Sequence, residues 1–209
     1  MAKPDASIEP RILECAKKEF LLCGYEKAST NVICKNAGVT SGALYKRYSG
    51  KDDLFCALVS PVADQFKDLV KKRNDNFHAL DQHEQEEAAL GPKSQAAVFI
   101  DHVYKHFDVF KLLIDCAKGS SYENYLHKLV DILVDATVRF MKESGHRAVI
   151  YGKTATPQII HILVSSYLSG LFEPVTHNMS REEACLYAEQ LQYFFNIGWA
   201  DILHLDIKE

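Results

Sequence analysis

The sequence lacks the features that mark secreted and membrane proteins. Its six cysteines, at positions 15, 23, 34, 56, 116 and 185, include no C-x-x-C pair. Scattered thiols are typical of a reducing cytoplasm, so we expect no disulfide framework. The first ten residues, MAKPDASIEP, contain no apolar stretch, which predicts no signal peptide. The longest apolar run, Ile159 to Phe172, carries His161 and several serines and is expected to be too short to cross a bilayer.

Catalytic fingerprints are also missing. We find no G-x-S-x-G, H-E-x-x-H, phosphate-binding loop or dinucleotide-binding glycine pattern. His102 and His106 have the i, i+4 spacing at which two imidazoles can share a metal, but no cysteine or carboxylate at a supporting spacing completes a site. The sequence therefore predicts no enzyme, no metal site and no cofactor. An enzyme on a helical scaffold and an interaction module without DNA contact remain as alternatives.

Charge is spread unevenly along the 209 residues. Residues 1–60 hold nine Lys/Arg and seven Asp/Glu, a net charge of +2, whereas residues 61–209 hold fifteen and twenty-one, a net charge of −6. A basic front part favours a polyanionic partner at that end, although many unrelated proteins show a similar asymmetry.

Apolar residues recur at helical spacing along the chain, which predicts an all-α protein. The first helical face is formed by Ile12, Leu13, Ala16, Phe20 and Cys23. Gly24 is expected to cap this helix in a left-handed conformation, and the Ser29 hydroxyl to cap a second, short helix that ends at Gly38. A third helix is expected to begin at Thr40 or Ser41.

The rest of the chain is expected to continue as helices. Ser49 should cap a fourth helix, which begins near Lys51 and runs through Val70. Residues 74–95 are polar and acidic and predict a loop or a poorly ordered connection, in which a helical turn can occur. Helical runs are expected over residues 96–106, 107–117, 122–142, 157–177 and 181–205. A short extended piece is expected only in GHRAVIYGKTATP, Gly145 to Pro157.

Helix, glycine turn and helix within about twenty residues is the arrangement of a helix-turn-helix. The second of these helices starts with the small residues Thr40 to Ala43, which can approach base edges closely. Tyr45, Lys46 and Arg47 behind them are long enough to reach phosphates. Lys51 starts the next helix, where free amides and a cation together favour a phosphate. Taken alone, the run YKRY is more often a core tyrosine beside a solvated basic face; the turn glycine and the short preceding helix favour DNA.

The same stretch resembles the DNA-binding domain of the TetR family of bacterial transcriptional repressors. The resemblance extends from Ile8 to Val59 and rests on RILECAKKEF, GYEKAST, NAGVTSGALYKRY and GKDDLF. It implies a three-helix, helix-turn-helix DNA-binding domain over residues 1–50 and a C-terminal helical bundle over residues 51–209 for ligand binding and dimerisation. It further implies a cytoplasmic, ligand-responsive repressor that binds a palindromic double-stranded DNA operator as a homodimer, with an unidentified small-molecule effector and no membrane partner.

Residue chemistry and the resemblance together give a set of DNA-binding candidates. These are Ser29, Thr30, Asn31, Thr40, Ser41, Gly42, Ala43, Tyr45, Lys46, Arg47 and Lys51. The sequence departs from the family pattern at three places. Asn31 stands where arginine is common, Cys34 replaces a small alanine, and Arg47 and Tyr48 replace an aromatic or histidine followed by phenylalanine. Asn31 is expected to lose a guanine contact or to replace it with an adenine-type contact, and Cys34 is expected to pack much as alanine does. The change at Arg47 and Tyr48 is expected to alter phosphate contacts more than the fold.

One recognition helix makes few base contacts, so a two-fold dimer is expected. The last two helices are apolar over more than one face, which suits either a dimer interface or central helices of one core. The candidate interface residues are Ser166, Gly170, Tyr187, Leu191, Phe194, Phe195 and Trp199. The aromatic middle helices suit either an ordinary core or an apolar ligand pocket. The candidate pocket residues are Phe99, Tyr104, Phe107, Phe110, Cys116, Tyr125 and His161.

Overall fold

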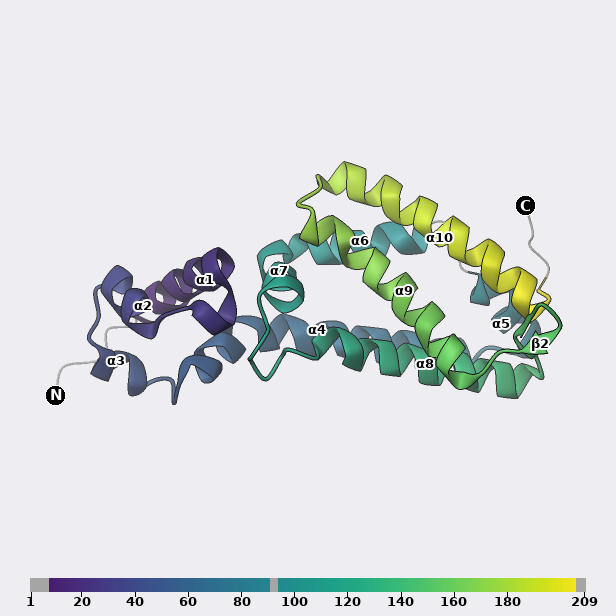
Figure 1. The fold of residues 1–209 in the computed structure, drawn as a ribbon, viewed down its shortest axis with the longest axis horizontal. Coiled ribbons are helices and arrows are strands. Elements are labelled where there is room, and N and C mark those ends of the chain that lie inside the picture. The colour runs from purple at the N-terminus through teal and green to yellow at the C-terminus, as the bar shows by residue number, and fades with distance from the viewer. Residues whose placement is uncertain (1–7, 91–93, 206–209) are drawn as a thin grey trace. The chain divides into compact units, whose positions relative to one another are not determined.

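The structure, a computed structural model, describes residues 8–90 and 94–205, which form ten α-helices and one two-stranded hairpin (Figure 1). The predicted all-α class is confirmed. The chain divides into two compact units. The first comprises the residues up to Gln65 together with His106–Tyr125, and the second comprises Phe66–Lys105 and the residues from Leu126 onward. Helix α4, Lys51–His78, contributes residues to both units.

The first unit contains the start of α4 and four further helices. These are α1 (Ile8–Lys27), α2 (Thr30–Ala37), α3 (Ser41–Tyr45) and α7 (Phe107–Asp115). Three aromatic rings fill its centre: the centroid of Phe55 lies 5.1 Å from that of Phe20 and 5.4 Å from that of Tyr25, both edge to face. Such pairs stabilise a core beyond the area they bury.

Two of the expected caps in this unit are wrong. Gly24 has φ 74° and ψ 163°, which kinks the chain, and helical turns resume as far as Lys27. The Ser29 side chain makes no capping hydrogen bond. Instead its backbone N–H donates to Glu19 Oε1 at 3.1 Å, so a carboxylate from α1 supplies the acceptor that the sequence assigned to Ser29.

The turn between α2 and α3 follows the sequence prediction. Gly38 adopts the left-handed conformation, with φ 64° and ψ 37°, and Val39 N–H then donates to Cys34 O at 3.0 Å. Thr40 is the N-cap of α3, since its Oγ1 accepts from Ala43 N–H at 3.2 Å. A left-handed glycine and a hydroxyl cap therefore fix the chain reversal between the two helices.

Because residues with a Cβ are strained at positive φ, Gly38→Ala is expected to lower the free energy of unfolding by about 1 kcal/mol. Gly42→Ala is the matched control, since Gly42 lies within α3 and an added Cβ would meet only Thr40 Oγ1, at 4.0 Å. We expect no loss of stability there. Urea unfolding followed by circular dichroism measures both variants, and equal losses would contradict the role of the turn.

Residues 74–90 correct the predicted loop. Helix α4 continues to His78, where the Phe77 ring packs 5.5 Å from that of Phe140. Helix α5 (Gln82–Ala89) follows, opened by a capping box in which Asp81 and Glu84 each accept from the other's backbone N–H. The spacing D-x-x-E is a helix-start signal that the polar composition concealed. Residues 91–93 of the predicted loop lie outside the described residues.

The second unit is built from helices around α10 (Arg181–Leu203). The other elements are α6 (Ser94–Lys105), α8 (Tyr125–Ser144) after its first residue, α9 (Pro157–Thr176), β1 (Val149–Ile150) and β2 (Lys153–Thr154). The two strands pair antiparallel, with Val149 opposite Thr154, within the segment where an extended piece was predicted. Small residues such as Ala184 and Ala188 on α10 are fully buried against α6 and α9, which permits close approach of the helices.

Helix α9 is longer than the apolar run Ile159 to Phe172 that it contains. With 20 residues it is long and apolar enough to cross a membrane by length and composition alone, so the expectation that this segment is too short is wrong. Seven of its residues are buried within the second unit, among them Val164, Leu168 and Phe172. A core helix of a globular unit passes the same test, so this feature is weak evidence for a membrane span.

Candidate DNA-binding surface and ligand cavity

The leading edge of α3 is open to solvent. Thr40, Ser41 and Gly42 are exposed, while Leu44 on the opposite side is completely buried in the first unit. Ala43 between them is half-buried. One face of this short helix therefore belongs to the core, and the face with the small hydroxyl-bearing residues is free to approach another molecule.

Long side chains follow this edge. Tyr45 is 50% exposed, and its hydroxyl lies 3.1 Å from Thr30 Oγ1 at the start of α2. Lys46 and Asn31 are exposed. A hydroxyl pair and a free ammonium beside the open edge are the donors that phosphate oxygens require.

Arg47 and Lys51 are more committed to their own chain. Arg47 is half-buried and donates from Nη1 to Ala43 O at 3.0 Å. Lys51 Nζ donates to Glu26 O and Ala28 O at 3.1 and 3.2 Å and lies 4.6 Å from the centre of the Tyr25 ring. Since an ammonium has three donors, two of those of Lys51 hold the α1–α2 connection against α4.

Two of the departures from the family pattern, Cys34 and Tyr48, lie in the packed part of this unit. Cys34 is buried on α2. Tyr48 is 5% exposed, and its hydroxyl donates to Glu9 Oε1 at 3.4 Å. Burial, followed by the nearby Glu9 carboxylate, raises the pKa of Tyr48. Tyr48 is therefore a core residue with a satisfied hydroxyl, and Ser29, half-buried, is likewise placed by its backbone bond to Glu19.

Helix α7 belongs to the same unit as α1. Lys17 Nζ lies 3.1 Å from Asp108 Oδ2, and Tyr25 N–H donates to Cys116 O at 2.9 Å. Among the pocket candidates, Phe110, Cys116 and Tyr125 are buried and Phe107 half-buried in this unit. The Tyr125 hydroxyl donates to Ala63 O at 3.1 Å, and burial raises the pKa of Cys116.

A cavity of about 300 Å³ lies within the second unit. Volumes of this order are typical of small-molecule sites. Six aromatic side chains line it: Phe66, Phe77, Phe99, Phe140, Tyr167 and Trp199. Among the described residues, its polar lining consists of Arg73, Asn74 and Thr137, together with the polar atoms of Tyr167 and Trp199.

Of the seven predicted pocket residues, the structure brings only Phe99 to this cavity. Tyr104 lies elsewhere in the second unit, where its hydroxyl donates to Met179 O at 2.8 Å. His161 is half-buried on α9 and is not part of the lining. Sequence reasoning missed Arg73, because residues after Val70 were not assigned to α4; extending the helical spacing of Phe66 and Val70 by three residues reaches it.

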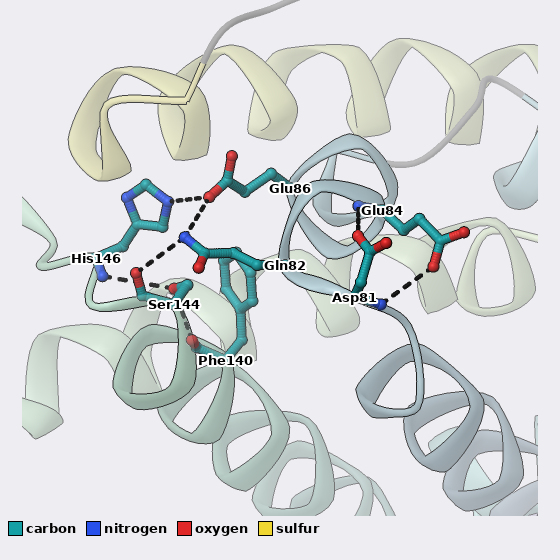
Figure 2. Close-up of polar contacts among 7 residues, drawn as sticks. All are labelled: Asp81, Gln82, Glu84, Glu86, Phe140, Ser144 and His146. Carbon is teal, nitrogen blue, oxygen red and sulfur yellow. Dashed lines mark hydrogen bonds and ion pairs between the residues drawn. The ribbon is translucent and has the colours of Figure 1, made fainter.

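One wall of the cavity comes from α5, whose Ala88 and Ala89 belong to the lining. Figure 2 shows how the polar side of α5 is held. Gln82 Nε2 donates to Glu86 Oε1 at 3.0 Å and to Ser144 O at 3.4 Å, and His146 Nε2 lies 3.2 Å from Glu86 Oε1. The hydrogen bonds from Gln82 and then His146 lower the pKa of Glu86.

Helices α9 and α10 carry an exposed apolar surface. Ile162 is 60% exposed, Tyr193 62% and Phe194 71%. Ser166 is also exposed on α9. Single exposed apolar residues are ordinary, whereas several large ones on two neighbouring helices are a feature often found where proteins bind one another.

The other interface candidates have contacts within the chain. A Cβ on Gly170 would lie 2.9 Å from Leu191 Cδ2, so the glycine permits α9 to pack on α10. Leu191, Tyr187 and Phe195 are half-buried, and the Phe195 ring lies 5.1 Å from that of Tyr167. Trp199 lines the cavity.

Metal chemistry finds no support in the part of the chain that the structure describes. Among residues 8–90 and 94–205, no group of three or more His, Cys, Asp or Glu side chains is arranged to hold an ion.

The short helix α2, the Gly38 turn and the open edge of α3 form a helix-turn-helix. Residues 12–58 match the model of the bacterial regulatory proteins of the tetR family. Residues 12–58 therefore form an N-terminal domain of the tetR family.

Solved structures share the fold over nearly the whole chain. NalD from Pseudomonas aeruginosa, the secondary repressor of the MexAB-OprM multidrug efflux pump, is 17% identical over 92% of this chain and 95% of its own, with a TM-score of 0.62. A TetR-like transcriptional regulator from Rhodococcus sp. RHA1 is 19% identical over 94% and 100%, with a TM-score of 0.60. The fatty acid degradation regulator FadR from Bacillus halodurans is 14% identical over 94% and 98%, with a TM-score of 0.58. At these identities the likeness shows the fold.

Proposed function

We propose that this protein is a ligand-responsive transcriptional repressor that binds a palindromic DNA operator as a homodimer. The observation that carries the proposal is the exposed edge of α3, with Thr40, Ser41 and Gly42 open to solvent and Leu44 buried behind them. A helix presented in this way can enter the major groove, where small leading residues approach base edges. Such a repressor acts in the cytoplasm, where its DNA lies.

The remaining contacts position the helix. Tyr45, Lys46 and Thr30 bind phosphates beside the groove, and Asn31 offers the side-chain amide that pairs with adenine. Ser29, Ala43, Arg47 and Lys51 act mainly by holding α2, α3 and the start of α4 in place, because each is partly buried or bonded to its own chain. The candidate residues in the DNA-binding domain over 1–50, and Lys51 next to it, therefore fall into two groups: those that contact DNA and those that hold the DNA-binding helices in place.

The dimer forms through α9 and α10. Ile162, Tyr193 and Phe194 supply exposed apolar area on these helices, and Ser166 lies on the same exposed side of α9. A two-fold axis there places one α3 edge in each half-site of a palindrome, about 34–36 Å apart. The regulatory and dimerisation domain over residues 51–209 then controls that spacing.

Ligand response uses the cavity of the second unit. A molecule that binds it in one arrangement of the dimer only shifts the population towards that arrangement. The coupling to DNA is then about 1–3 kcal/mol, a five- to 150-fold change in affinity. Helix α4, which has residues in both units, is the connection through which this coupling acts.

The proposal is tested on DNA selected from a random duplex library with the purified protein. We expect the selected sequences to share an inverted repeat. If each half-site neutralises two phosphates, the slope of log Kobs against log salt is about −3.6 or steeper for the dimer. Fluorescence anisotropy of the labelled duplex measures the slope. A flat salt response, or selected DNA without repeat symmetry, contradicts a dimeric DNA-binding function and favours the interaction module.

A further inference from the structure

The cavity of the second unit contains one cationic side chain among apolar walls. Arg73 on α4 is the only Lys, Arg, Asp or Glu in its lining, as far as the described residues show. Its solvent-accessible surface is that of an exposed residue, yet surrounding protein atoms desolvate the guanidinium enough to lower the pKa of Arg73. Both observations fit a guanidinium that lies at the border between the cavity and solvent.

Arg73 makes no ion pair or hydrogen bond with the residues that the structure describes. The carboxylates of α5 already have partners: Glu84 is held in the capping box with Asp81, and Glu86 accepts from Gln82 beside His146 (Figure 2). Glu87 lies 3.7 Å from His83. A partly desolvated charge without a counter-charge is unfavourable, and an anion that enters the site compensates it.

The rest of the cavity lining indicates that the body of the ligand is apolar. Phe66, Phe99 and Trp199 present aromatic surface, and Tyr167 adds a hydroxyl-bearing ring to the same lining as Arg73. Burial raises the pKa of Tyr167, and the Arg73 charge opposes that rise. A planar guanidinium binds a carboxylate through two parallel hydrogen bonds, which fixes the orientation of the bound molecule.

We infer that the cavity binds a small monoanion with an apolar body, its carboxylate paired with Arg73 and its body against the aromatic walls. This assignment rests on the proposed function, because it names the chemical class of the effector. It adds a specificity residue, Arg73, and it excludes cationic and neutral apolar compounds as preferred ligands. Charge complementarity, rather than shape alone, decides among molecules of similar size.

The chain carries its own reporter for this site, since its single tryptophan, Trp199, lines the cavity. Trp199 emission is titrated with decanoate and 4-butylbenzoate, each compared with the alcohol of the same skeleton, and with decyltrimethylammonium. We expect at least one carboxylate to bind about tenfold or more tightly than its alcohol, the difference of one charge-assisted hydrogen bond. The ammonium compound should bind more weakly than either.

Two variants isolate the role of Arg73. Arg73→Gln should reduce carboxylate affinity to that of the alcohol and leave alcohol affinity unchanged, while Arg73→Lys should retain part of the preference. Lys72→Gln, the same change of charge at an exposed neighbour on α4, should alter neither. The inference is overturned if the alcohols bind as tightly as both carboxylates, if no carboxylate binds, or if Arg73→Gln keeps the preference.

Operator binding, measured on the same samples, separates this inference from the proposed function. If a neutral compound binds the protein and causes it to release its operator, the ligand-responsive repressor is supported and the anionic class of ligand is overturned. A carboxylate that binds through Arg73 without changing DNA affinity supports the anionic site and contradicts regulation through it.

Discussion

Alanine at both Tyr45 and Lys46 is expected to lower operator affinity by about 1000-fold while the protein stays folded. Each substitution removes a phosphate donor, and a dimer loses four such donors. At about 1 kcal/mol for each, the loss is about 4 kcal/mol, or three orders of magnitude. The measurement is fluorescence anisotropy with the selected operator. The salt slope should become less steep in the same variant, because fewer counterions are released.

The fold should tolerate these changes because both side chains are outside the core. Tyr45 is 50% exposed, and its hydroxyl pairs with that of Thr30, so its loss costs at most about 1 kcal/mol of stability. Lys142→Ala, an exposed lysine on α8 in the second unit, is the charge-matched control and should bind DNA normally. Unchanged operator binding by the double variant would show that α3 is not the recognition helix.

Glutamate at Phe194 is expected to convert the dimer to a monomer. Phe194 is 71% exposed in the single chain, and its burial in an interface contributes about 1.5–3 kcal/mol for each copy. The substitution removes that contribution twice and also places two carboxylates in an apolar interface, where an unpaired charge is strongly unfavourable. Sedimentation velocity at micromolar concentration should show a species of half the mass. Operator affinity should fall by about 100-fold or more as cooperation between half-sites is lost.

The control for this variant is Tyr151→Glu. Tyr151 is a fully exposed aromatic residue at the turn of the β1–β2 hairpin, so the same kind of change is made outside α9 and α10. It should remain a dimer with normal DNA affinity. A Phe194→Glu protein that is still dimeric would place the interface elsewhere on the chain.

The turn between α2 and α3 shows which features the sequence could predict. The sequence predicts that α2 ends at Gly38 and that α3 begins at Thr40 or Ser41, because a glycine turn and a helix start depend on the identity of one residue and its immediate neighbours. The Ser29 cap was assigned by the same reasoning and was wrong. There the acceptor comes from Glu19, ten positions earlier, and only the packing of α1 beside α2 brings it close.

Most of the residues that line the cavity could not be predicted from the sequence. Phe99 and Phe107 are similar in the sequence, both aromatic residues in an apolar helical run, yet Phe99 lines the cavity in the second unit and Phe107 belongs to the first unit. Helical spacing says which residues share a face, but not which unit receives that face. Arg73 also lies directly before residues 74–95, whose acidic, polar composition concealed the end of α4 and the whole of α5.

By itself, the sequence determined the all-α class, the helix-turn-helix and its family, because helical periodicity and turn chemistry act over a few neighbouring residues. The tertiary structure was needed to show which side chains meet in the cavity, that Arg73 has no counter-charge there among the residues that the structure describes, and which apolar residues of α9 and α10 are exposed. Those features depend on contacts between helices far apart in the chain, and no local pattern encodes which of many possible helix pairs will form.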